Sequence, residues 1–106
     1  MKPKYDSQGF LLANRPLDAN FTGKIKDARG NKAWFKNGKH HRTDGPAVEW
    51  ANGDKEWLKD GVLHREDGPA IIWAGGSTEW WYEGKEGLVN FPEEVKKKLA
   101  RKFILD

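Results

Sequence analysis

The sequence contains no cysteine among its 106 residues and has no long hydrophobic run. Without cysteine the chain has no disulfide bond, no thiolate zinc site and no cysteine nucleophile. Its longest uninterrupted apolar segment, residues 70–74, is far shorter than the ~20 residues of a membrane-spanning helix. The first residues also lack the apolar segment of a secretory signal. We therefore expect a cytoplasmic protein that spans no membrane and is held together by packing alone.

Hydrophobic residues are few, and many of them carry large rings. They make up 37% of the chain, which has six tryptophans and five phenylalanines. A chain of this length has room for one domain, at roughly 100 to 200 residues per domain. Aromatic residues are typical of β-sheets and scarce in disordered chains. The composition therefore predicts one small, mainly β domain over residues 1–106.

Positive charge is concentrated at the two ends of the chain. The net charge is +3, with +3 on residues 1–29, −2 on residues 30–92 and +2 on residues 93–106. A groove that follows a nucleic-acid backbone needs a continuous basic stripe. Because the middle segment is mildly acidic, the charge gives only weak support to nucleic-acid binding.

A repeat with a period of 23 residues runs through the middle of the chain. A Gly-x-x-x-Trp motif recurs at residues 30–34, 53–57 and 76–80. The motif His-Arg-x-Asp-Gly-Pro-Ala follows at residues 41–47 and again at residues 64–70, but the third copy lacks it. A regular period of this length, which keeps rare residue types in step, indicates stacked structural repeats.

Each copy has the sequence of a β-hairpin. Asn-Gly and Asp-Gly pairs at residues 37–38 and 60–61 predict tight turns, and glycine-containing pairs at residues 52–53 and 75–76 predict the links between hairpins. In Asp-Gly-Pro the proline has no N–H for a ladder and the glycine tolerates positive φ, so we expect a bulge there. The sequence therefore predicts an up-and-down antiparallel meander of hairpin repeats over residues 30–89.

These motifs resemble the MORN repeat family. The resemblance rests on Trp-x-x-(Asn/Asp)-Gly, a second strand that carries histidine and an Asn-Gly link, and it covers about residues 30–84. The His-Arg-x-Asp-Gly-Pro-Ala form is similar to a variant found in small proteins of bacteria and their phages. It differs from the common pattern in having arginine after the histidine, at Arg42 and Arg65. The resemblance implies an open β-sheet that serves as an interaction scaffold and shares no catalytic chemistry.

An N-terminal arm or first strand is predicted at residues 1–29. Within it, residues 22–26 are expected to form a strand that pairs with residues 31–36. This pairing would extend the repeat array at its N-terminal end.

An amphipathic helix is predicted at residues 90–106. Asn90 suits an N-cap, and Val95, Leu99 and Phe103 recur every four residues. The other face of the helix carries five basic residues: Lys96, Lys97, Lys98, Arg101 and Lys102. We interpret the helix as a cap over the open end of the array. The alternatives are a basic helix that binds anionic lipid or nucleic acid, and a helix that docks onto a partner.

The aromatic rows and the neighbouring His-Arg pairs are the predicted partner-binding residues. They are Trp34, Trp57, Trp80, Trp50, Trp73, Arg42, Arg65, His41 and His64. Strand alternation puts Trp34 and its repeat equivalents on one face of the sheet, and Phe35 and its equivalents on the other. A single-layer sheet cannot cover both faces, so some tryptophan is expected to stay accessible. For any one row, a purely structural role in the core is the alternative.

Catalysis and metal binding are not expected. His41 and His64 stand two strand spacings apart, about 9 to 10 Å, which is too far for one zinc ion to bind both. His40 points to the opposite face of the strand. The two serines, Ser7 and Ser77, lie in no nucleophile motif, and no phosphate-binding glycine motif is present. We therefore expect no cofactor, and we interpret the His-Arg-x-Asp segments as structural, with aspartate capping the turn and histidine or arginine bonding to the adjacent repeat.

The sequence as a whole predicts a non-enzymatic protein-protein interaction module, a monomer or weak homo-oligomer. In the bacterial or phage setting that the resemblance implies, such a module would bind and modulate a host protein. The alternative is a single-stranded nucleic-acid-binding protein, with bases stacked on tryptophan and phosphates held by the basic termini.

Overall fold

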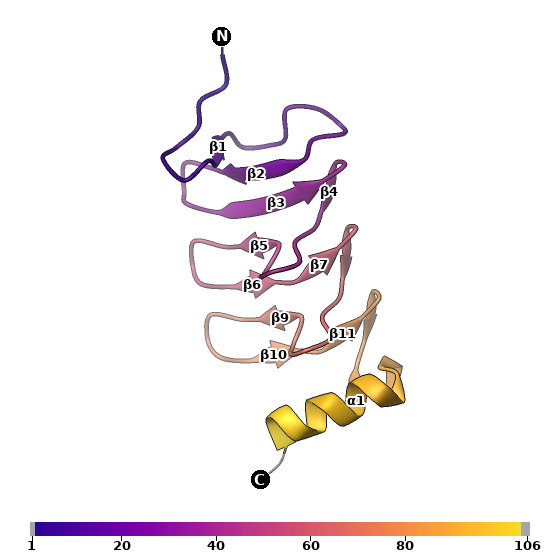
Figure 1. The fold of residues 1–106 in the computed structure, drawn as a ribbon. Coiled ribbons are helices and arrows are strands. Elements are labelled where there is room, and N and C mark those ends of the chain that lie inside the picture. Colours follow the sequence, from indigo (N-terminus) through magenta and orange to yellow (C-terminus); the bar gives the residue numbers. More distant parts are fainter. Residues whose placement is uncertain (1, 105–106) are drawn as a thin grey trace.

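The computed structural model describes residues 2–104 as a stack of short β-hairpins with a helix across one end (Figure 1). The molecule is elongated, with extents of 54 × 28 × 20 Å. The chain runs steadily along the long axis from the N-terminal strands to the helix, so hairpins that follow one another in sequence lie side by side. No helix within the described residues is both long enough and apolar enough to cross a membrane.

The strands are short and form one main sheet and two small ones. The main sheet contains, in spatial order, β1 (Leu11–Leu12), β2 (Gly23–Lys26), β3 (Lys32–Lys36), β5 (Val48–Glu49), β6 (Lys55–Glu56), β9 (Ile71–Ile72) and β10 (Thr78–Glu79), and β4 (Lys39–His40) also pairs with β3. The small sheets are the hairpins β7 (Leu58–Lys59) with β8 (Val62–Leu63), and β11 (Trp81–Tyr82) with β12 (Lys85–Glu86).

The chain is mainly β with one short C-terminal helix, as the composition predicts. The predicted pairing of residues 22–26 with residues 31–36 is confirmed, because β2 and β3 are antiparallel with Ile25 opposite Ala33. The main sheet is mixed, because β1 runs parallel to β2 at the N-terminal end, outside residues 30–89 for which the antiparallel meander is predicted. The connection between these two strands is long enough to return to the start of the sheet, so β2 can run in the direction of β1.

The hairpins on the right-hand side of Figure 1 close in tight turns. The residues of these turns have positive φ. Asn37 and Asp60 have φ of 50°, and each is followed by a glycine with positive φ, as predicted for residues 37–38 and 60–61. Glu83 forms the same turn at the third layer, with φ of 48°. Each turn is bonded to the preceding layer: the N–H of Gly61 donates to the His40 carbonyl at 2.8 Å. The layers are therefore joined through their turns as well as through the sheet.

The Asp-Gly-Pro segments differ from the prediction in their geometry. Neither Gly45 nor Gly68 has positive φ. Instead, each glycine lies against the arginine of its own motif: a Cβ added to Gly68 would stand 2.7 Å from Cζ of Arg65. The break in the strand is also longer than a bulge, because β4 ends at residue 40 and β5 begins at residue 48. The motif needs glycine for space beside an arginine, and the predicted backbone role is wrong.

The helix α1 (Glu93–Leu99) continues into a π-helical turn at Ala100–Ile104 and lies across the C-terminal end of the stack (Figure 1). Leu99, on its inner face, is only 4% exposed. Phe91, just before the helix, is 3% exposed. The position of α1 agrees with the predicted cap, although the last two residues of the predicted helix lie outside the described part of the chain.

The predicted N-cap role of Asn90 is wrong. Asn90 belongs to a 3-10 turn at Leu88–Asn90, and its side-chain amide donates to the carbonyls of Glu86 at 2.7 Å and Gly87 at 3.3 Å. The residue at the N-cap position is Pro92, which has no side-chain cap bond. Asn90 therefore closes the turn that leads to the helix and leaves the helix N-terminus uncapped by a side chain.

The N-terminal arm is fastened to the sheet through Asp6. Lys26 Nζ lies 2.6 Å from Asp6 Oδ2, and the N–H groups of Gln8 and Phe10 donate to Asp6 Oδ1 at 2.9 Å. The hydrogen bond with Lys26, helped by these two backbone bonds, lowers the pKa of Asp6 from 3.8 to about 2.

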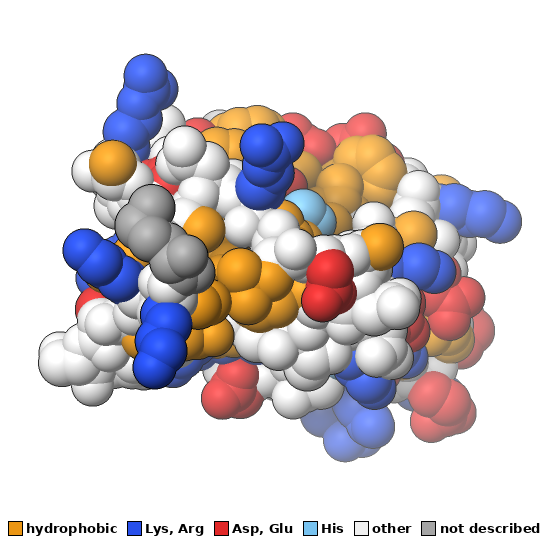
Figure 2. All heavy atoms as spheres, turned by 90° about the horizontal axis from the view of Figure 1, so that it is seen from above, with side chains coloured by type: hydrophobic (Ala, Val, Ile, Leu, Met, Phe, Trp, Pro, Cys, Tyr) orange, Lys and Arg blue, Asp and Glu red, His pale blue; other side chains and the backbone are white. Residues whose placement is uncertain are grey.

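In the view from the N-terminal end, hydrophobic side chains are visible between projecting Lys and Arg side chains (Figure 2).

The ion pair of Asp6 with Lys26 predicts a pH-dependent contribution to stability. Because the pKa of Asp6 is lower in the folded chain, its contribution is complete above about pH 4 and is lost as the pH falls towards 2. We expect Asp6→Asn to lower the melting temperature most at neutral pH and hardly at all near pH 2. Melting curves from pH 7 to 2 measure this, with Glu94→Gln as a control. A difference between wild type and Asp6→Asn that does not shrink with falling pH would contradict it.

Candidate functional site

Each His-Arg-x-Asp-Gly-Pro segment folds its arginine over a tryptophan of the same repeat. Cζ of Arg42 lies 3.8 Å from the ring centroid of Trp34, and Cζ of Arg65 lies 3.9 Å from that of Trp57. A guanidinium this close to an indole ring makes a cation–π contact and packs well. The two arginines, predicted to bind a partner, are thus used first to cover the chain's own rings.

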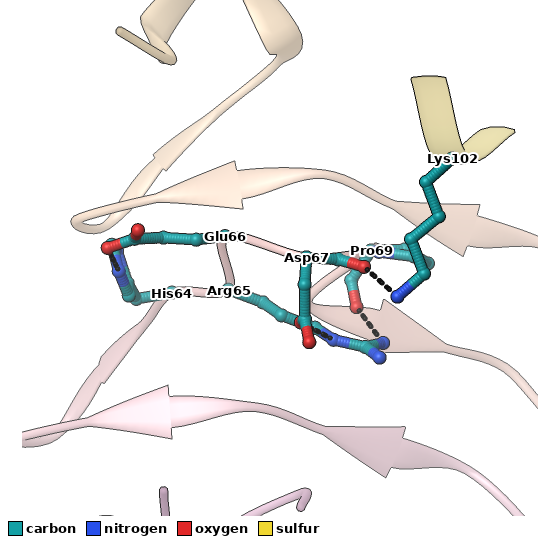
Figure 3. A network of polar contacts seen from close by, with 6 residues as sticks. All are labelled: His64, Arg65, Glu66, Asp67, Pro69 and Lys102. Carbon is teal, nitrogen blue, oxygen red and sulfur yellow. Dashed lines mark hydrogen bonds and ion pairs between the residues drawn. The ribbon is translucent and has the colours of Figure 1, made fainter. Parts of the chain in front are cut away.

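Polar contacts hold each arginine in this position. Arg65 Nε donates to Asp67 Oδ1 at 2.9 Å, and its Nη1 donates to the Pro69 carbonyl at 3.0 Å (Figure 3). Arg42 makes the same contacts with Asp44 and Pro46, at 2.8 and 3.1 Å. Asp44 and Asp67 therefore bind arginine side chains. The sequence predicted only that these aspartates cap a turn.

The same contacts keep both aspartates ionised. The hydrogen bond from Arg42, reinforced by its charge, lowers the pKa of Asp44. Burial by itself would raise the pKa of Asp67, but the hydrogen bond and charge of Arg65 and the charge of Lys102 outweigh it, and the pKa is lowered. At neutral pH each motif therefore carries a matched pair of opposite charges.

The histidines of the motif join successive layers. The N–H of Asp60 donates to Nδ1 of His41 at 3.1 Å, and the N–H of Glu83 donates to Nδ1 of His64 at 2.9 Å. In the first layer Thr22 Oγ1 takes this place and accepts the N–H of Asn37. The interpretation that histidine bonds to the adjacent repeat is confirmed. Across residues 2–104, no three histidine, aspartate or glutamate side chains stand close enough together to hold a metal ion.

A cavity of 680 Å³ opens between the two motifs. It is lined by residues of both His-Arg-x-Asp segments and of the strand between them: His41, Arg42, Thr43, Asp44, Gly45, Trp57, Leu58, Lys59, His64, Arg65, Glu66 and Asp67. We call this cavity the central slot. It contains five of the nine predicted partner-binding residues, Trp57 among them, so residues 23 positions apart in sequence lie in one place.

At the N-terminal end, the tryptophan of the first layer is covered by the arm. Phe10, which is 5% exposed, packs edge-on against Trp34 with 5.3 Å between ring centroids. Lys24 Nζ lies 4.5 Å from the centroid of the Phe10 ring. Trp34 thus has Arg42 and Phe10 as ring neighbours.

At the C-terminal end, the tryptophan of the third layer is covered by the helix. Phe103 packs edge-on against Trp80 with 5.5 Å between centroids, and Phe91 lies 6.3 Å from the same ring. Lys102 Nζ donates to the Asp67 carbonyl at 3.1 Å (Figure 3). Leu88 occupies the position that corresponds to Arg42 and Arg65 in the repeat. The helix therefore covers the ring that the missing third arginine would have covered.

The tryptophan of the middle layer has different ring neighbours from the other two, although all three are half-buried. Within residues 2–104, Trp57 has no aromatic neighbour, and its ring partner is the guanidinium of Arg65. Its ring lines the central slot. Of the three equivalent tryptophans, Trp57 alone among the described residues lacks a phenylalanine beside it.

The other predicted tryptophans lie at the links between hairpins. Trp50 and Trp73 are 44% and 38% exposed, and their Nε1 atoms donate to Glu56 Oε2 at 2.7 Å and Glu79 Oε2 at 3.0 Å. These bonds fix the indoles without covering them. The structure therefore separates these tryptophans, which are open to solvent, from Trp34 and Trp80, which the ends of the chain cover.

The opposite face of the strands carries its own aromatic contacts. Phe35 packs against Phe21 and His40, with 6.0 and 4.5 Å between ring centroids. Burial lowers the pKa of His40, and the charge of Glu56 partly offsets this. The predicted alternation is confirmed at β3, since Trp34 and Phe35 contact different sets of residues.

The basic residues of the helix have different surroundings. Lys96 pairs with Glu93 at 2.6 Å, and Lys102 is bonded to the Asp67 carbonyl. The other three, Lys97, Lys98 and Arg101, have exposed side chains. The helix therefore uses part of its basic face within the molecule.

Three kinds of functional residue were missed by the sequence prediction. Asp44 and Asp67 hold the arginines, and their constant place two residues after arginine is a signal for this pairing. Gly45 and Gly68 provide the space. Phe10 covers a ring far away in sequence, and no local pattern indicates it, whereas Phe103 belongs to the predicted capping face of the helix.

Comparison of the chain with protein-family models, with curated proteins and with solved structures gives no match. The function is therefore inferred from the contacts within the molecule.

Proposed function

We propose that the protein is a non-enzymatic module that binds a protein partner at the central slot. The observation that carries this proposal is the unequal covering of three equivalent tryptophans. Trp34 and Trp80 are each packed against a phenylalanine of this chain, whereas Trp57 is left at the edge of a 680 Å³ cavity. Partly buried tryptophan beside arginine is the composition of energetic hot spots in protein interfaces.

The slot is prepared for binding because its side chains are already fixed. Arg42 and Arg65 are held by aspartate side chains and backbone carbonyls, so neither has to be ordered when a partner arrives. Immobilising a long side chain costs roughly 0.5 to 1.5 kcal/mol, and a rigid site avoids this cost. A rigid slot of this kind can distinguish between partner proteins by the shape of the surface that enters it.

The charges of the slot favour a polypeptide over a nucleic acid. Asp44 and Asp67 lie in its wall as carboxylates, and Glu66 lines it as well. The arginines nearby are already paired with the two aspartates. A phosphate backbone in the slot would meet these three carboxylates, and Lys59 is the one lining lysine or arginine without an ion pair among the described residues. Single-stranded nucleic acid therefore remains the less favoured alternative.

We also propose that the repeated unit is a MORN-like hairpin. Three contacts that recur 23 residues apart support this proposal: the arginine over the tryptophan, the histidine on the turn of the next layer, and the acceptor for the N–H of the link. In the third of these contacts, the N–H of Ala51 donates to Asn31 Oδ1 and the N–H of Ala74 donates to Asp54 Oδ1, both at 2.7 Å. Recurrent contacts between neighbouring layers are typical of repeat proteins.

Affinity capture with slot variants tests the proposed function. Thr43 is exposed and lines the slot, so Thr43→Tyr is expected to fill it without disturbing the core. Ser77→Tyr places the same side chain on an exposed link far from the slot. From a lysate of the source cells, wild type and Ser77→Tyr should retain a specific protein that Thr43→Tyr loses.

Two results would overturn the proposal. One is capture of the same proteins by all three forms. The other is binding of mixed single-stranded oligonucleotides at ~50 mM salt, with log affinity falling against log salt, which would favour the nucleic-acid alternative.

A further inference from the structure

We infer that the exposed tryptophans Trp50 and Trp73 form a second binding surface, which takes two arginine side chains of a protein partner. Each tryptophan directly follows a strand of the main sheet, β5 or β9, and begins the link to the next strand. The two links lie one above the other on the left-hand side of Figure 1. Neither tryptophan lines the central slot, so the inference goes beyond the proposed function and does not depend on it.

Trp50 belongs to the face of the sheet that is turned away from the central slot. It lines a cavity of 600 Å³ together with Phe35 and Leu58. These two residues directly follow Trp34 and Trp57 in the sequence, and successive side chains of a strand point to opposite faces. The second tryptophan of the row holds the same position one repeat later. The surface and the slot are therefore separate.

A carboxylate is fixed beside each of the two exposed indoles. Trp50 Nε1 donates to Glu56 Oε2 at 2.7 Å, and Trp73 Nε1 donates to Glu79 Oε2 at 3.0 Å. Glu79 Oε1 also accepts the indole N–H of Trp81, at 3.0 Å. Neither glutamate has an ion-pair partner among residues 2–104. Each link therefore presents an aromatic ring with a carboxylate that still has room for a cation.

The chain shows elsewhere how this pair of groups is completed. The guanidinium of Arg42 lies over the Trp34 ring, 3.8 Å from its centroid, and pairs with Asp44 and Glu49 at 2.8 and 3.2 Å. In such a set of indole, guanidinium and carboxylate, a cation–π contact and an ion pair act on the same cation. Within residues 2–104, no lysine or arginine lies over the ring of Trp50 or of its repeat equivalent. The cation is therefore the member of the set that a partner supplies.

Two cations of this chain line the same cavity as Trp50, namely Arg15 and Lys32. Lys32 Nζ lies 5.3 Å from the ring of Phe10, on the other face of the sheet. Arg15 has an exposed side chain and lies before the repeat array, so Trp73 has no equivalent of it. Neither residue therefore serves both exposed tryptophans.

The spacing of the two sites defines the segment of the partner. β5 and β9 are separated by β6 alone, so the tryptophans that follow them stand two strand spacings apart, about 9.6 Å at ~4.8 Å per strand. Residues three apart in a polyproline II helix lie on one side, about 9.3 Å from each other. In a β-strand, the nearest residues on one side are only about 6.8 Å apart. Polyproline II segments also dock onto aromatic surfaces without an ordering cost. The best fit is a segment of this kind with arginines three residues apart.

A short arginine-proline peptide is the direct probe. Its sequence is Pro-Pro-Arg-Pro-Pro-Arg-Pro-Pro, with both ends blocked, and it is added to the full-length protein while the indole N–H signals are followed by ¹⁵N NMR. We expect the signals of Trp50 and Trp73 to shift, with those of Trp34 and Trp57 unchanged. Added salt should weaken the binding, because it screens exposed ion pairs. A peptide with lysine in place of arginine should bind about twofold to fivefold more weakly, since lysine lacks the planar group that stacks on an indole.

Glutamine variants of the protein test the carboxylates. In Glu56→Gln and Glu79→Gln the side-chain oxygen still accepts the indole N–H, but the charge is lost. Each variant should bind the peptide about twofold to fivefold more weakly, the range of an exposed ion pair. Glu94→Gln, which removes a charge on the exposed side of the helix, should bind like wild type. Arg15→Gln removes a positive charge from the cavity and should bind at least as strongly.

Several results would overturn the inference. They are unshifted Trp50 and Trp73 signals at ~2 mM peptide, equal binding of a peptide whose arginines stand two residues apart, and unchanged binding by both glutamine variants. Shifts of the same signals on concentrating the protein alone would identify a second copy as the occupant, which also overturns it. Thr43→Tyr should bind the peptide like wild type, because it fills only the central slot. Loss of the captured protein in that variant tests the proposed function separately.

Discussion

Removal of residues 91–106 is expected to unfold the protein or to make it aggregate. The deleted segment includes Phe91 and Leu99, which are 3% and 4% exposed, and the Phe103 ring that packs on Trp80. Burial of Phe91 and Leu99 contributes roughly 1.5 to 3 kcal/mol each, and Phe103, which is 50% exposed, contributes less, against a total stability of ~5 to 15 kcal/mol for a small domain. Deletion would also uncover the last strands of the stack, and exposed strand edges favour aggregation. Size-exclusion chromatography and thermal melting measure the outcome.

A point substitution gives a graded version of the same test. Leu99→Ala is expected to cost about 2 to 5 kcal/mol of unfolding free energy, the usual range for a buried leucine. Lys97→Ala, on the exposed side of the same helix, should change stability by less than about 0.5 kcal/mol. A truncated chain that stays monomeric with an unchanged melting temperature would show that the helix is no cap, and a helix free to bind lipid or a partner would then be the better interpretation.

Gly68→Val is expected to destabilise the protein by about 2 to 4 kcal/mol, although it replaces a glycine that has an ordinary φ. A Cβ at this position would stand 2.7 Å from Cζ of Arg65 and 2.8 Å from its Nη1. The guanidinium would have to leave the Trp57 ring, which also breaks its bonds to Asp67 and the Pro69 carbonyl. Overpacking and the lost cation–π contact act together here.

Gly75 provides the matched control for this substitution. A Cβ at Gly75 would meet nothing within 4 Å, and its φ is outside the positive range. Gly75→Ala should therefore be neutral or stabilise slightly, whereas Gly68→Ala should already destabilise. Urea unfolding of the two alanine variants and of Gly68→Val decides the matter. Equal midpoints for Gly68→Ala and Gly75→Ala would show that the arginine can move away at no cost.

The comparison of Gly38 with Gly68 shows how far local patterns could be interpreted. Asn37 and Gly38 form a turn pair, and both residue types favour positive φ by themselves. The structure has the expected positive φ at both residues. In Asp-Gly-Pro the same residue type was expected to serve its backbone in the same way. There the constraint comes from Arg65, three residues away, whose position depends on Trp57, between β6 and β7. A contact of this kind has no local sequence pattern.

Glu83 is a turn residue that the local sequence does not predict and that contacts with the neighbouring layer stabilise. Glutamate is a poor residue for positive φ, yet it adopts φ of 48° at the turn of the third layer. Its N–H is bound by Nδ1 of His64, and the N–H of Gly84 donates to the Leu63 carbonyl. These hydrogen bonds from the preceding layer stabilise a turn conformation that glutamate does not favour by itself.

By itself, the sequence determined the features that repeat and the features that are local: the mainly β composition, the turns at residues 37–38 and 60–61, the pairing of β2 with β3 and a helix near the C-terminus. These depend on backbone preference and on periodicity, which short stretches of sequence contain. The tertiary structure alone decided which tryptophan is covered. Phe10 and Phe103 reach Trp34 and Trp80 from outside the predicted repeat array, because the folded path of the two ends brings them there, and Trp57 has no aromatic neighbour within the described residues.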